Sequence, residues 1–443
     1  MMKFTLPEQV NTALKLLLEN GFEAYAVGGC VRDLVMGKMP NDYDITTNAM
    51  PEETEKVFEG FRIIETGIKH GTVTVIADGM PLEITTYRID GEYLDSRHPE
   101  TVSFSRNLKD DLSRRDFTVN TLCYNEKEGV IDLFGGIEDI DRKIIRCVGE
   151  PDKRFNEDAL RILRGIRFAC SLGFTVEEET AQSILRNKDL IKNIAAERVR
   201  DEFVKLITAD RIYDNVSRFR EVIEVFIPEY GALTGCEQNT PYHCYDVFEH
   251  SVRSAEYIEN DRNLRLTMFL HDIAKPLCKT TDEFGTDHFK GHAKAGAEMA
   301  EDILRRMKFD NNAIKYVPFL IGLHSERFPV SKTEAKEMLR RIGREAYLDF
   351  IKVRRADTLA KKDPHSKDEK IKNMLAFYEA IEKNGECWNL ESLAVNGSDI
   401  KELGVKSGPE IKRLLDFALG EVIHKRVPND KQSILNLIED LTE

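Results

Sequence analysis

Residues 25–46, YAVGGCVRDLVMGKMPNDYDIT, contain the pattern around which the rest of the chain is organised. A short apolar run ends at Gly28-Gly29, and a DYD triplet later leads into a second apolar run. Because residues two apart in a strand project from one face, Asp42 and Asp44 are predicted to lie side by side. Adjacent carboxylates repel one another unless a cation lies between them. Mg²⁺ accepts such oxygen ligands together with substrate phosphates, so the stretch predicts phosphoryl or nucleotidyl transfer.

The residues before the DYD triplet have the character of a phosphate-binding turn. Gly28 and Gly29 let backbone N–H groups approach a phosphate closely, and Arg32 can neutralise its charge. For this stretch alone a structural role is an equal alternative, because a DxD triplet is a common loop feature and a Gly-Gly pair is usually a turn. Motifs further along the chain decide between the two.

The composition is that of a soluble chain with more than one core. A length of 443 residues predicts two to four domains. No apolar run approaches the length of a membrane span, and the first residues predict an amphipathic helix instead of a signal peptide. The eight cysteines are far apart and form no CxxC pair, which predicts free thiols in a reducing, cytoplasmic setting.

The net charge of −14 argues at first against a nucleic-acid partner. The charge is uneven, however: between Lys153 and Arg220 there are 14 Lys and Arg residues against 11 Asp and Glu residues, a local excess of +3. Because a local basic face can bind a phosphate backbone, the overall sign excludes nothing.

The first third of the chain predicts a helix followed by strands. The helix covers residues 51–60, and the strands cover 61–66, 71–77 and 81–88. Glu83 in the last strand is either a third carboxylate near the metals or an ordinary exposed strand residue. Residues 88–99 are predicted to form a mobile polar loop.

Two further motifs contain dense groups of charges. RRDFTVN at 114–120 is a polar cluster, or an ion-paired turn. From residue 155 to the end the pattern is helical, and Asp158, Arg161, Arg164 and Arg167 recur at spacing three on one predicted helix face. Such a row is usually a solvated face. The planar, directional hydrogen bonding of Asp and Arg would also suit recognition of a nucleobase.

Together these motifs resemble a known enzyme family. GGCVRD, DYD, RRDFTVN and EDALRILRGIRF occur in this order over residues 20–206, as in the class II tRNA nucleotidyltransferases. That family comprises CCA-adding enzymes and their A-adding, CC-adding and bacterial poly(A) polymerase relatives. The resemblance implies an α+β head with a small mixed sheet, similar to DNA polymerase β, followed by an all-α neck, body and tail.

The resemblance also implies roles for particular residues. Asp42 and Asp44 would hold catalytic Mg²⁺. The residues implied to bind the nucleotide are Gly28, Gly29, Arg32, Arg115, Asp158, Arg161, Arg164 and Arg167. Of these, Asp158 and Arg161 would pair with the base of CTP or ATP. The reaction implied is template-independent addition of C, C and A to the 3′ end of tRNA, and the loop at 88–99 resembles the one associated with adding A.

A second group of residues indicates different chemistry. His250, His271, Asp272, His292, His324 and Asp357 are spread over predicted helices. Imidazole and carboxylate together suit Mn, Fe, Ni or Zn. A lone helical histidine is more often a surface or core residue, but the adjacent His271-Asp272 pair makes coincidence less plausible. His243 would lie at the rim of the site, one helical turn before His250 if that stretch is helical.

This second pattern resembles the HD phosphohydrolases over residues 240–360, in which a metal-activated water attacks a phosphoester. The part around it would serve as an RNA-binding body or a second enzyme. AVNGSDI and SGPEIKRLL, within 391–423, resemble the tRNA-binding tail of the CCA-adding and A-adding group. The predicted domains are a head (1–150), a neck with the nucleotide-selecting motif (151–220), a body with the HD-type site (221–385) and a tail (386–443).

Three alternatives remain at this point. The chain is an A-adding enzyme or a poly(A) polymerase of the same family, or mainly a phosphohydrolase acting on RNA ends or nucleotides, or a non-catalytic RNA-binding protein. The last is weak, because two complete acidic sites are poor partners for phosphate unless metals intervene. No membrane partner is expected, and the oligomeric state is open.

Overall fold

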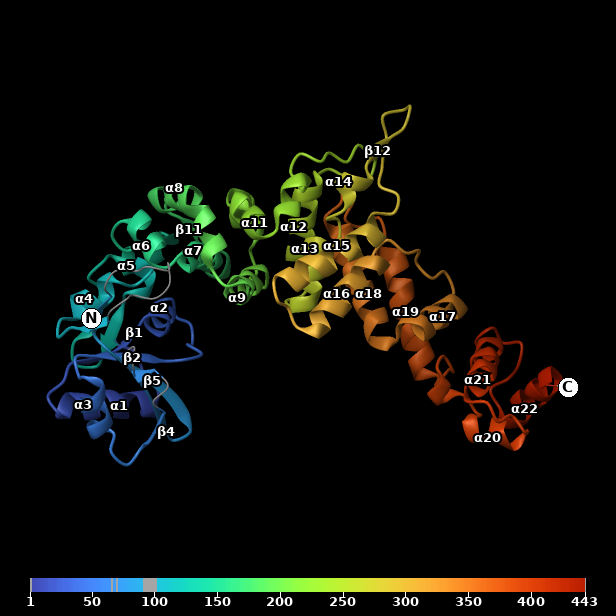
Figure 1. Cartoon of the computed structure of the whole chain (residues 1–443), viewed down its shortest axis with the longest axis horizontal. Coiled ribbons are helices and arrows are strands. Elements are labelled where there is room, and N and C mark those ends of the chain that lie inside the picture. Colours follow the sequence, from blue (N-terminus) through green and yellow to red (C-terminus); the bar gives the residue numbers. More distant parts are fainter. Residues whose placement is uncertain (1, 65–66, 69–70, 91–101, 443) are drawn as a thin grey trace. The chain divides into compact units, whose positions relative to one another are not determined.

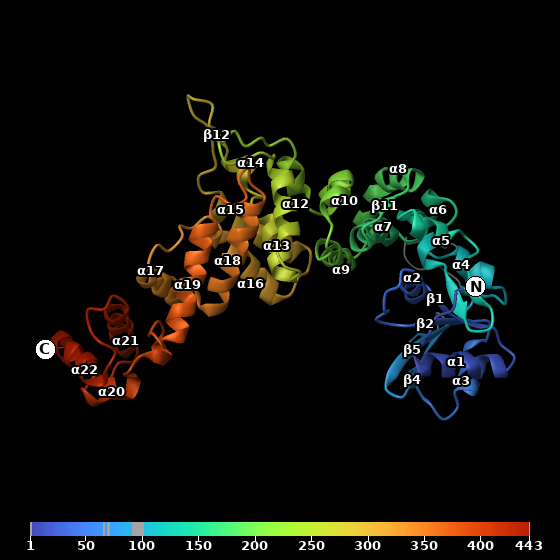
Figure 2. The same cartoon turned by 180° about the vertical axis from the view of Figure 1, so that it is seen from behind.

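A computed structural model describes residues 2–64, 67–68, 71–90 and 102–442. The chain divides into two compact units, Met1–Gly231 and Ala232–Glu443. Figures 1 and 2 show a sheet with helices in the first unit and helices throughout the second. Residues 91–99 of the predicted loop lie outside the described residues. The finer division into head, neck, body and tail stays a prediction.

A seven-stranded mixed sheet forms the centre of the first unit. In spatial order its strands are β3 (Arg62–Ile64), β4 (Thr72–Ala77), β5 (Met80–Thr86), β2 (Asp44–Thr47), β1 (Ala24–Val27), β8 (Cys123–Asn125) and β9 (Gly129–Ile131). Strands β2 and β5 run parallel, and the other neighbouring pairs of this sheet run antiparallel. This mixed sheet and the helices that follow it confirm the predicted fold class.

The sequence pattern explains why these strands form. In β4, Val73, Val75 and Ala77 are buried, whereas the residues between them are partly exposed. Strand β1 is buried along its whole length. The three strands predicted at 61–66, 71–77 and 81–88 correspond to β3, β4 and β5.

Helices and a small hairpin surround the sheet. The helices are α1 (Glu8–Glu19), α2 (Gly29–Val35), α3 (Pro51–Val57), α4 (Leu108–Ser113) and α5 (Gly136–Asp141), and the hairpin is β6 (Arg88–Asp90) with β7 (Val102–Phe104). Helix α3 begins at the predicted proline, and Glu53 accepts a hydrogen bond from the Met50 N–H at 2.7 Å. Helices α1 and α3 pack against strands of the sheet.

The rest of the first unit is mainly helical. Its elements are β10 (Ile144–Ile145), α6 (Pro151–Glu157), α7 (Leu160–Leu172), β11 (Thr175–Val176), α8 (Glu178–Asn187), α9 (Ala196–Ile207), α10 (Tyr213–Arg218) and α11 (Arg220–Phe226). The expectation of helix alone after residue 155 is therefore wrong. Gly173 ends α7 in the left-handed conformation at φ 68°, and the reversed chain then forms β11, parallel to β10.

The second unit contains eight helices before its terminal part, among the residues described. They are α12 (Val247–Tyr257), α13 (Arg262–Leu270), α14 (Lys275–Cys278), α15 (His292–Arg306), α16 (Asn311–Leu323), α17 (Lys332–Ile342), α18 (Arg344–Leu359) and α19 (Asp368–Lys383). A short hairpin, β12 (Thr280–Thr281) with β13 (Asp287–His288), interrupts them.

The terminal part has a core of its own. It consists of α20 (Gly397–Glu402), α21 (Gly408–Ile423) and α22 (Lys431–Thr442), which Figure 1 colours orange to red. Ile400, Leu414 and Ile434 are among the buried residues of this core. Helix α21 carries a proline in its first turn, as predicted for the turn at Gly408-Pro409. It also contacts α17.

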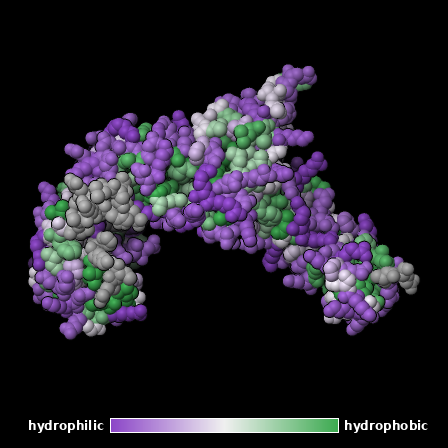
Figure 3. Space-filling view, viewed as in Figure 1, coloured by the Kyte–Doolittle hydropathy of each residue, from purple (hydrophilic) through white to green (hydrophobic). Residues whose placement is uncertain are grey.

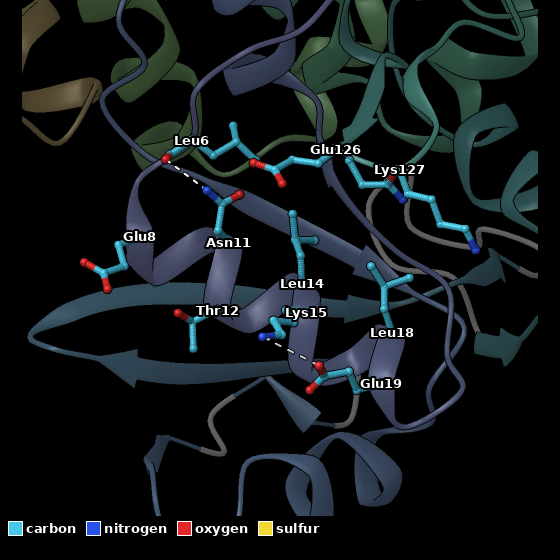
Figure 4. A pocket seen from close by; sticks show the side chains of 11 residues that line it. Leu6, Glu8, Asn11, Thr12, Leu14, Lys15, Leu18, Glu19, Glu126 and Lys127 are labelled. Carbon is cyan, nitrogen blue, oxygen red and sulfur yellow. Dashed lines mark hydrogen bonds and ion pairs between the residues drawn. The ribbon is translucent and has the colours of Figure 1, made fainter.

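The described surface in Figure 3 is mostly hydrophilic. Among the described residues, no helix combines the length and apolar character that crossing a membrane requires. Figure 4 shows a pocket on the head between α1 and residues 125–127. Its polar groups bond within the wall: Lys15 pairs with Glu19 at 3.7 Å, and Asn11 donates to the Leu6 carbonyl at 3.3 Å. No predicted site residue lines this pocket.

Candidate active site and candidate metal centre

One pocket of the first unit, about 490 Å³ in volume, collects every residue predicted for nucleotide chemistry. These residues are Gly28, Gly29, Arg32, Asp42, Asp44, Arg115, Asp158, Arg161, Arg164 and Arg167. They come from four sequence motifs that span 140 positions. The pocket also includes residues that were not predicted as site residues, namely Arg88, Arg114, Asp116, Asn120 and Phe168.

Gly28 stands where a larger residue would not fit. Its φ of 83° lies in the region that only glycine adopts easily. A Cβ atom there would also lie 3.2 Å from an Arg115 guanidinium nitrogen. The Gly28 N–H donates to the carbonyl of Leu122, the residue directly before β8, at 3.0 Å. The turn therefore brings backbone and Arg115 together at the pocket wall.

The carboxylates are positioned differently from the prediction. Strand β2 begins only at Asp44, so Asp42 precedes the strand and the two do not share its alternation. Asp44 is instead in register with Glu83 on the parallel strand β5. Because side chains in register point to the same side of a sheet, the hypothesis of a third carboxylate at this place gains support.

These neighbours change the proton affinity of Asp44. Partial burial, then Glu83, raise the pKa of Asp44 to about 6, and Asp42 adds to the rise, while Arg115 acts in the opposite direction. A divalent cation among the carboxylates would remove this repulsion. The donors are all oxygen atoms, so the residues present fit Mg²⁺.

Arg115 is held at the pocket by one carboxylate. Its guanidinium pairs with Asp111 at 3.2 Å, while its Nε is buried and has no hydrogen-bond partner among the described residues. Asp111 also accepts from Thr46 at 3.1 Å. Burial alone would raise the pKa of Asp111, but Arg115 and Arg114 hold it below its usual value. Arg115 is therefore a fixed cation with unused hydrogen-bonding capacity.

A chain of hydrogen bonds links α2 through the 114–120 motif to α7. Arg32 donates to Asn120 at 2.8 Å, Asn120 donates to Asp116 at 3.1 Å, and Arg164 donates to Asp116 at 2.6 Å. Burial alone would raise the pKa of Asp116, but Arg164 and these hydrogen bonds lower it to about 2. The 114–120 motif is thus both an ion-paired turn and part of the pocket.

Asp158 does not share a helix with the arginines. Helix α6 ends at Glu157, and Asp158 is extended at φ −138° before α7 begins. Asp158 accepts from the Leu160 N–H at 3.1 Å. The break turns Asp158 into the pocket beside Arg161, and Arg161 itself donates to Glu157 at 3.0 Å. The predicted single face is wrong, although the residues still line one pocket.

Phe168 is the one apolar residue among the pocket residues that the sequence analysis missed. Three guanidinium groups lie over its ring, those of Arg167 at 3.9 Å, Arg164 at 5.2 Å and Arg32 at 5.4 Å from the centroid. Arg167 is also paired with Glu202 at 2.7 Å. The only signal in the sequence was an aromatic residue directly after the last arginine of the row.

The second unit brings the six predicted histidine and aspartate residues into one cluster. Each lies on or directly after a helix: His250 in α12, His271 and Asp272 after α13, His292 at the start of α15, His324 after α16 and Asp357 in α18. We call these six residues the body cluster. Their side chains are buried, except that His292 is partly exposed.

The Nε2 atoms of the four histidines converge. Those of His250 and His271 are 3.3 Å apart, and those of His292 and His324 are 3.1 Å apart. Each ring is anchored through Nδ1 to a backbone carbonyl: His271, His292 and His324 bind the carbonyl three residues earlier, and His250 binds that of Ala360. Because a carbonyl only accepts, any of these rings in its neutral form presents the lone pair of Nε2 to the centre.

Asp272 lies between the two histidine pairs. One of its oxygens is 3.1 Å from His271 Nε2, and the other is 3.5 Å from His292 Nε2. Neither oxygen accepts a hydrogen bond among the described residues, although Lys275 forms an ion pair with one of them at 2.6 Å. Asp357 lies 3.2 Å from His250 Nε2. The atoms form two groups of three ligands that share Asp272.

The electrostatics keep these groups in the forms that bind cations. Burial lowers the pKa of His250 and His324, and lowers that of His292 to about 4, so their rings are neutral. Burial alone would raise the pKa of Asp272, but His271 and Lys275 hold it well below its usual range. Converging lone pairs and a carboxylate with no hydrogen bond fit a pair of divalent metal ions.

His243 is not on a helix, contrary to the expectation. Helix α12 begins at Val247, so no helical spacing relates His243 to His250, and their seven-residue separation would be about two turns of a helix. The His243 ring nevertheless lies edge to face against His250, with centroids 5.4 Å apart. Burial, with Lys275 next, lowers the pKa of His243 to about 3.

Known proteins resemble this chain along its whole length. The "Poly A polymerase head domain" model matches residues 24–146, the "Probable RNA and SrmB- binding site of polymerase A" model matches 173–231, and a model for tRNA nucleotidyltransferase domain 2 matches 291–438. The CCA-adding enzyme of Limosilactobacillus fermentum is 32% identical over 443 residues, which cover 99% of this chain and 98% of that one. The chain belongs to the CCA-adding enzyme family. This confirms the predicted resemblance to the tRNA nucleotidyltransferases, whereas the resemblance to the HD phosphohydrolases stays a prediction.

Other members of the CCA-adding family agree with this result. The CCA-adding enzyme of Lactobacillus delbrueckii is 50% identical over 198 residues, and this match spans half the length of that relative. A crystal structure of the Bacillus stearothermophilus CCA-adding enzyme in complex with CTP has a TM-score of 0.75 at 29% identity, covering 99% of this chain and 98% of that one. The long, continuous matches show that head and helical part belong to one family architecture.

Proposed function

We propose that the chain adds C, C and A, from CTP and ATP, to the 3′ end of tRNA, using the pocket of the first unit. The observation that carries this proposal is the convergence of ten residues from four separate motifs on one pocket. Family membership supports the same activity. The attacking group is the RNA 3′-hydroxyl, the bond formed is to the α-phosphate, and pyrophosphate leaves.

Asp42 and Asp44 would hold Mg²⁺, with Glu83 beside them. When bound, Mg²⁺ supplies Lewis-acid stabilisation of the phosphate charge and favours loss of the hydroxyl proton. Arg115 offers its free Nε–H, and Arg32, fixed by Asn120, offers a second cation. These donors orient the triphosphate, which accounts for most of what a protein contributes to such a reaction.

Asp158 and Arg161 would select the base. Cytosine and adenine both present an amino donor beside a ring-nitrogen acceptor, whereas uracil and guanine present a carbonyl beside an N–H. A carboxylate that accepts and a guanidinium that donates therefore suit C and A and reject U and G. No nucleic-acid template is needed, because the protein side chains themselves present this pattern.

The Asp42→Ala variant tests the proposal. We expect it to abolish nucleotide addition while tRNA affinity, measured by filter binding, stays within about twofold, because recognition of tRNA rests on backbone and shape. A Glu138→Ala variant, which alters an exposed carboxylate paired with Arg142 away from the pocket, is the matched control and should keep its activity. Retained transfer in Asp42→Ala would overturn the metal assignment.

A second activity is proposed for the body cluster, namely metal-dependent hydrolysis of phosphoesters. The observation that favours it is the double ligand group around Asp272. A transition metal such as Mn, Fe, Ni or Zn would supply Lewis-acid activation of water there. The test is equilibrium binding of Mn²⁺ to the full chain. Wild type is expected to bind two more ions than Asp272→Ala, because both ligand groups share Asp272, and equal stoichiometry would contradict the proposal.

A further inference from the structure

His243 has a buried nitrogen that the proposed chemistry leaves unused. Its Nε2 atom has no hydrogen-bond partner among the described residues. The ring lies against His250, a member of the body cluster, at an interplanar angle of 84°. A histidine that only packs in a core usually has its buried nitrogens hydrogen-bonded, because an unpaired buried polar group costs about 1–3 kcal/mol.

The hydrogen bonds around His243 indicate which nitrogen carries the proton. Nδ1 lies 2.7 Å from the Thr240 hydroxyl oxygen, and that oxygen accepts from the Tyr242 N–H at 3.4 Å. A hydroxyl group can accept a hydrogen bond and donate one. The Thr240 hydroxyl does both if it accepts from the Tyr242 N–H and donates its own proton to Nδ1. The proton of the neutral imidazole then lies on Nε2. With this assignment Nε2 is a hydrogen-bond donor and not a metal ligand, unlike the Nε2 atoms of the body cluster.

Two lysines contact the cluster that the His243 ring lies against. Lys275 pairs with Asp272 at 2.6 Å, and Asp272 shares a ligand group with His250, the ring that His243 contacts. Lys275 also donates to Gln238 at 2.6 Å, and Lys361 pairs with Asp357 at 2.7 Å. Each lysine thus contacts one aspartate of the body cluster. Two ammonium groups and one N–H donor suit the oxygen atoms of a phosphate group.

We propose that His243 contacts the phosphate of a phosphoester bound at the body cluster, donating its Nε2–H to a phosphate oxygen beside Lys275 and Lys361. This inference rests on the proposed hydrolase function of the body cluster and adds a substrate-binding residue to it. The metal ligands are the six residues of the body cluster, and His243 recognises the anion.

Binding of inorganic phosphate to the full-length, Mn²⁺-loaded chain tests the inference by isothermal titration calorimetry. We expect His243→Ala to bind Mn²⁺ as wild type does but phosphate about tenfold more weakly, since a hydrogen bond to a charged group is lost. His243→Gln, whose amide offers an N–H of similar reach, is expected to recover part of the affinity. His288→Ala, which alters an exposed histidine paired with Asp282, is the control and should leave both Mn²⁺ binding and phosphate binding unchanged.

The outcomes separate the inference from the function on which it rests. Unchanged phosphate affinity in His243→Ala overturns the inference, as does a wild type that binds no phosphate. Loss of Mn²⁺ binding in His243→Ala also overturns it, because His243 would then be a metal ligand. If phosphate binding depends on His243 but the wild type hydrolyses no phosphoester, the hydrolase function fails while the inference stands.

Discussion

The pocket of the first unit and the body cluster of the second unit are both built around aspartates, but they are built in opposite ways. In the first pocket, Asp42 and Asp44 are exposed to solvent, and Arg115 and Arg164 are fixed by acids on other elements. In the body cluster, Asp272 is fully buried, and four imidazoles are anchored to backbone carbonyls. The first arrangement leaves room for a large charged ligand. The second leaves room for ions.

This difference bears on what each region can do. Side chains held by ion pairs can exchange partners, which would let the first pocket accept CTP and then ATP under the proposed function. Three rings of the body cluster, in contrast, are fixed by carbonyls only three residues away, which makes their positions a property of the helix ends. We therefore expect the first pocket to tolerate rearrangement and the body cluster to be preorganised.

The largest expected effect is a complete separation of the two activities. Asp44→Ala should reduce nucleotide addition by more than the roughly 10²–10³-fold that loss of one transition-state donor costs, and should leave Mn²⁺ binding by the body cluster unchanged. His324→Ala should weaken Mn²⁺ binding by the body cluster and leave nucleotide addition unchanged. Parallel incorporation and metal-binding assays on both variants provide the measurement. An effect of either variant on both readouts would contradict two independent sites.

The ion pair between Asp116 and Arg164 should contribute strongly to stability. Arg164→Ala leaves a buried carboxylate without its partner, which costs 3–5 kcal/mol for a fully buried pair. Because a third of the Arg164 side chain is exposed, we expect Arg164→Ala to lower the free energy of unfolding by about 2–3 kcal/mol. The measurement is urea unfolding of the full chain, following the transition of the first unit. Arg142→Ala, from an exposed pair with Glu138, is the control and should change stability little.

Nucleotide addition at subsaturating Mg²⁺ should fall as the pH is lowered through about 6, the pKa of Asp44, because the protonated carboxyl binds metal poorly. Glu83→Gln should move this decline to lower pH. Since folding raises this pKa from 3.8, the stability that Asp44 contributes is full below pH 3.8 and is lost as the pH rises through about 6. The acid loss of activity is therefore not unfolding at Asp44. An unchanged pH profile in Glu83→Gln would contradict the role of Glu83.

The smallest expected effect concerns the ring beneath the arginines. Phe168→Leu removes the aromatic face on which Arg32, Arg164 and Arg167 lie. The loss of cation–π attraction should cost about 1 kcal/mol in total. We expect the KM for nucleotide to rise about fivefold with little change in kcat. Phe168→Tyr keeps the face and should behave as wild type. A fall in kcat alone would show that the ring acts on another step.

The sequence predicted which residues form the two sites better than it predicted the helix and strand ends that position them. Side-chain chemistry and motif order were enough to bring ten residues to one pocket and six to the body cluster. The break at Asp158 and the start of β2 at Asp44 were not predictable, because helix and strand ends depend on tertiary packing as well as on local pattern. The pairing of Asp116 with Arg164, 48 positions apart, has no local signal at all. His243 was placed near the site through a helical spacing that does not exist.

Incorporation of labelled nucleotides with Mg²⁺ tests the central claim most directly. The substrates are tRNA that lacks its 3′ CCA and tRNA that ends in CC, each given CTP, ATP or both. The account predicts two C residues and one A on the first substrate, one A on the second, and none with Asp44→Ala. Addition of A to the CC-ended substrate alone, long A tails, or no incorporation would each contradict the claim that this chain builds the complete CCA end.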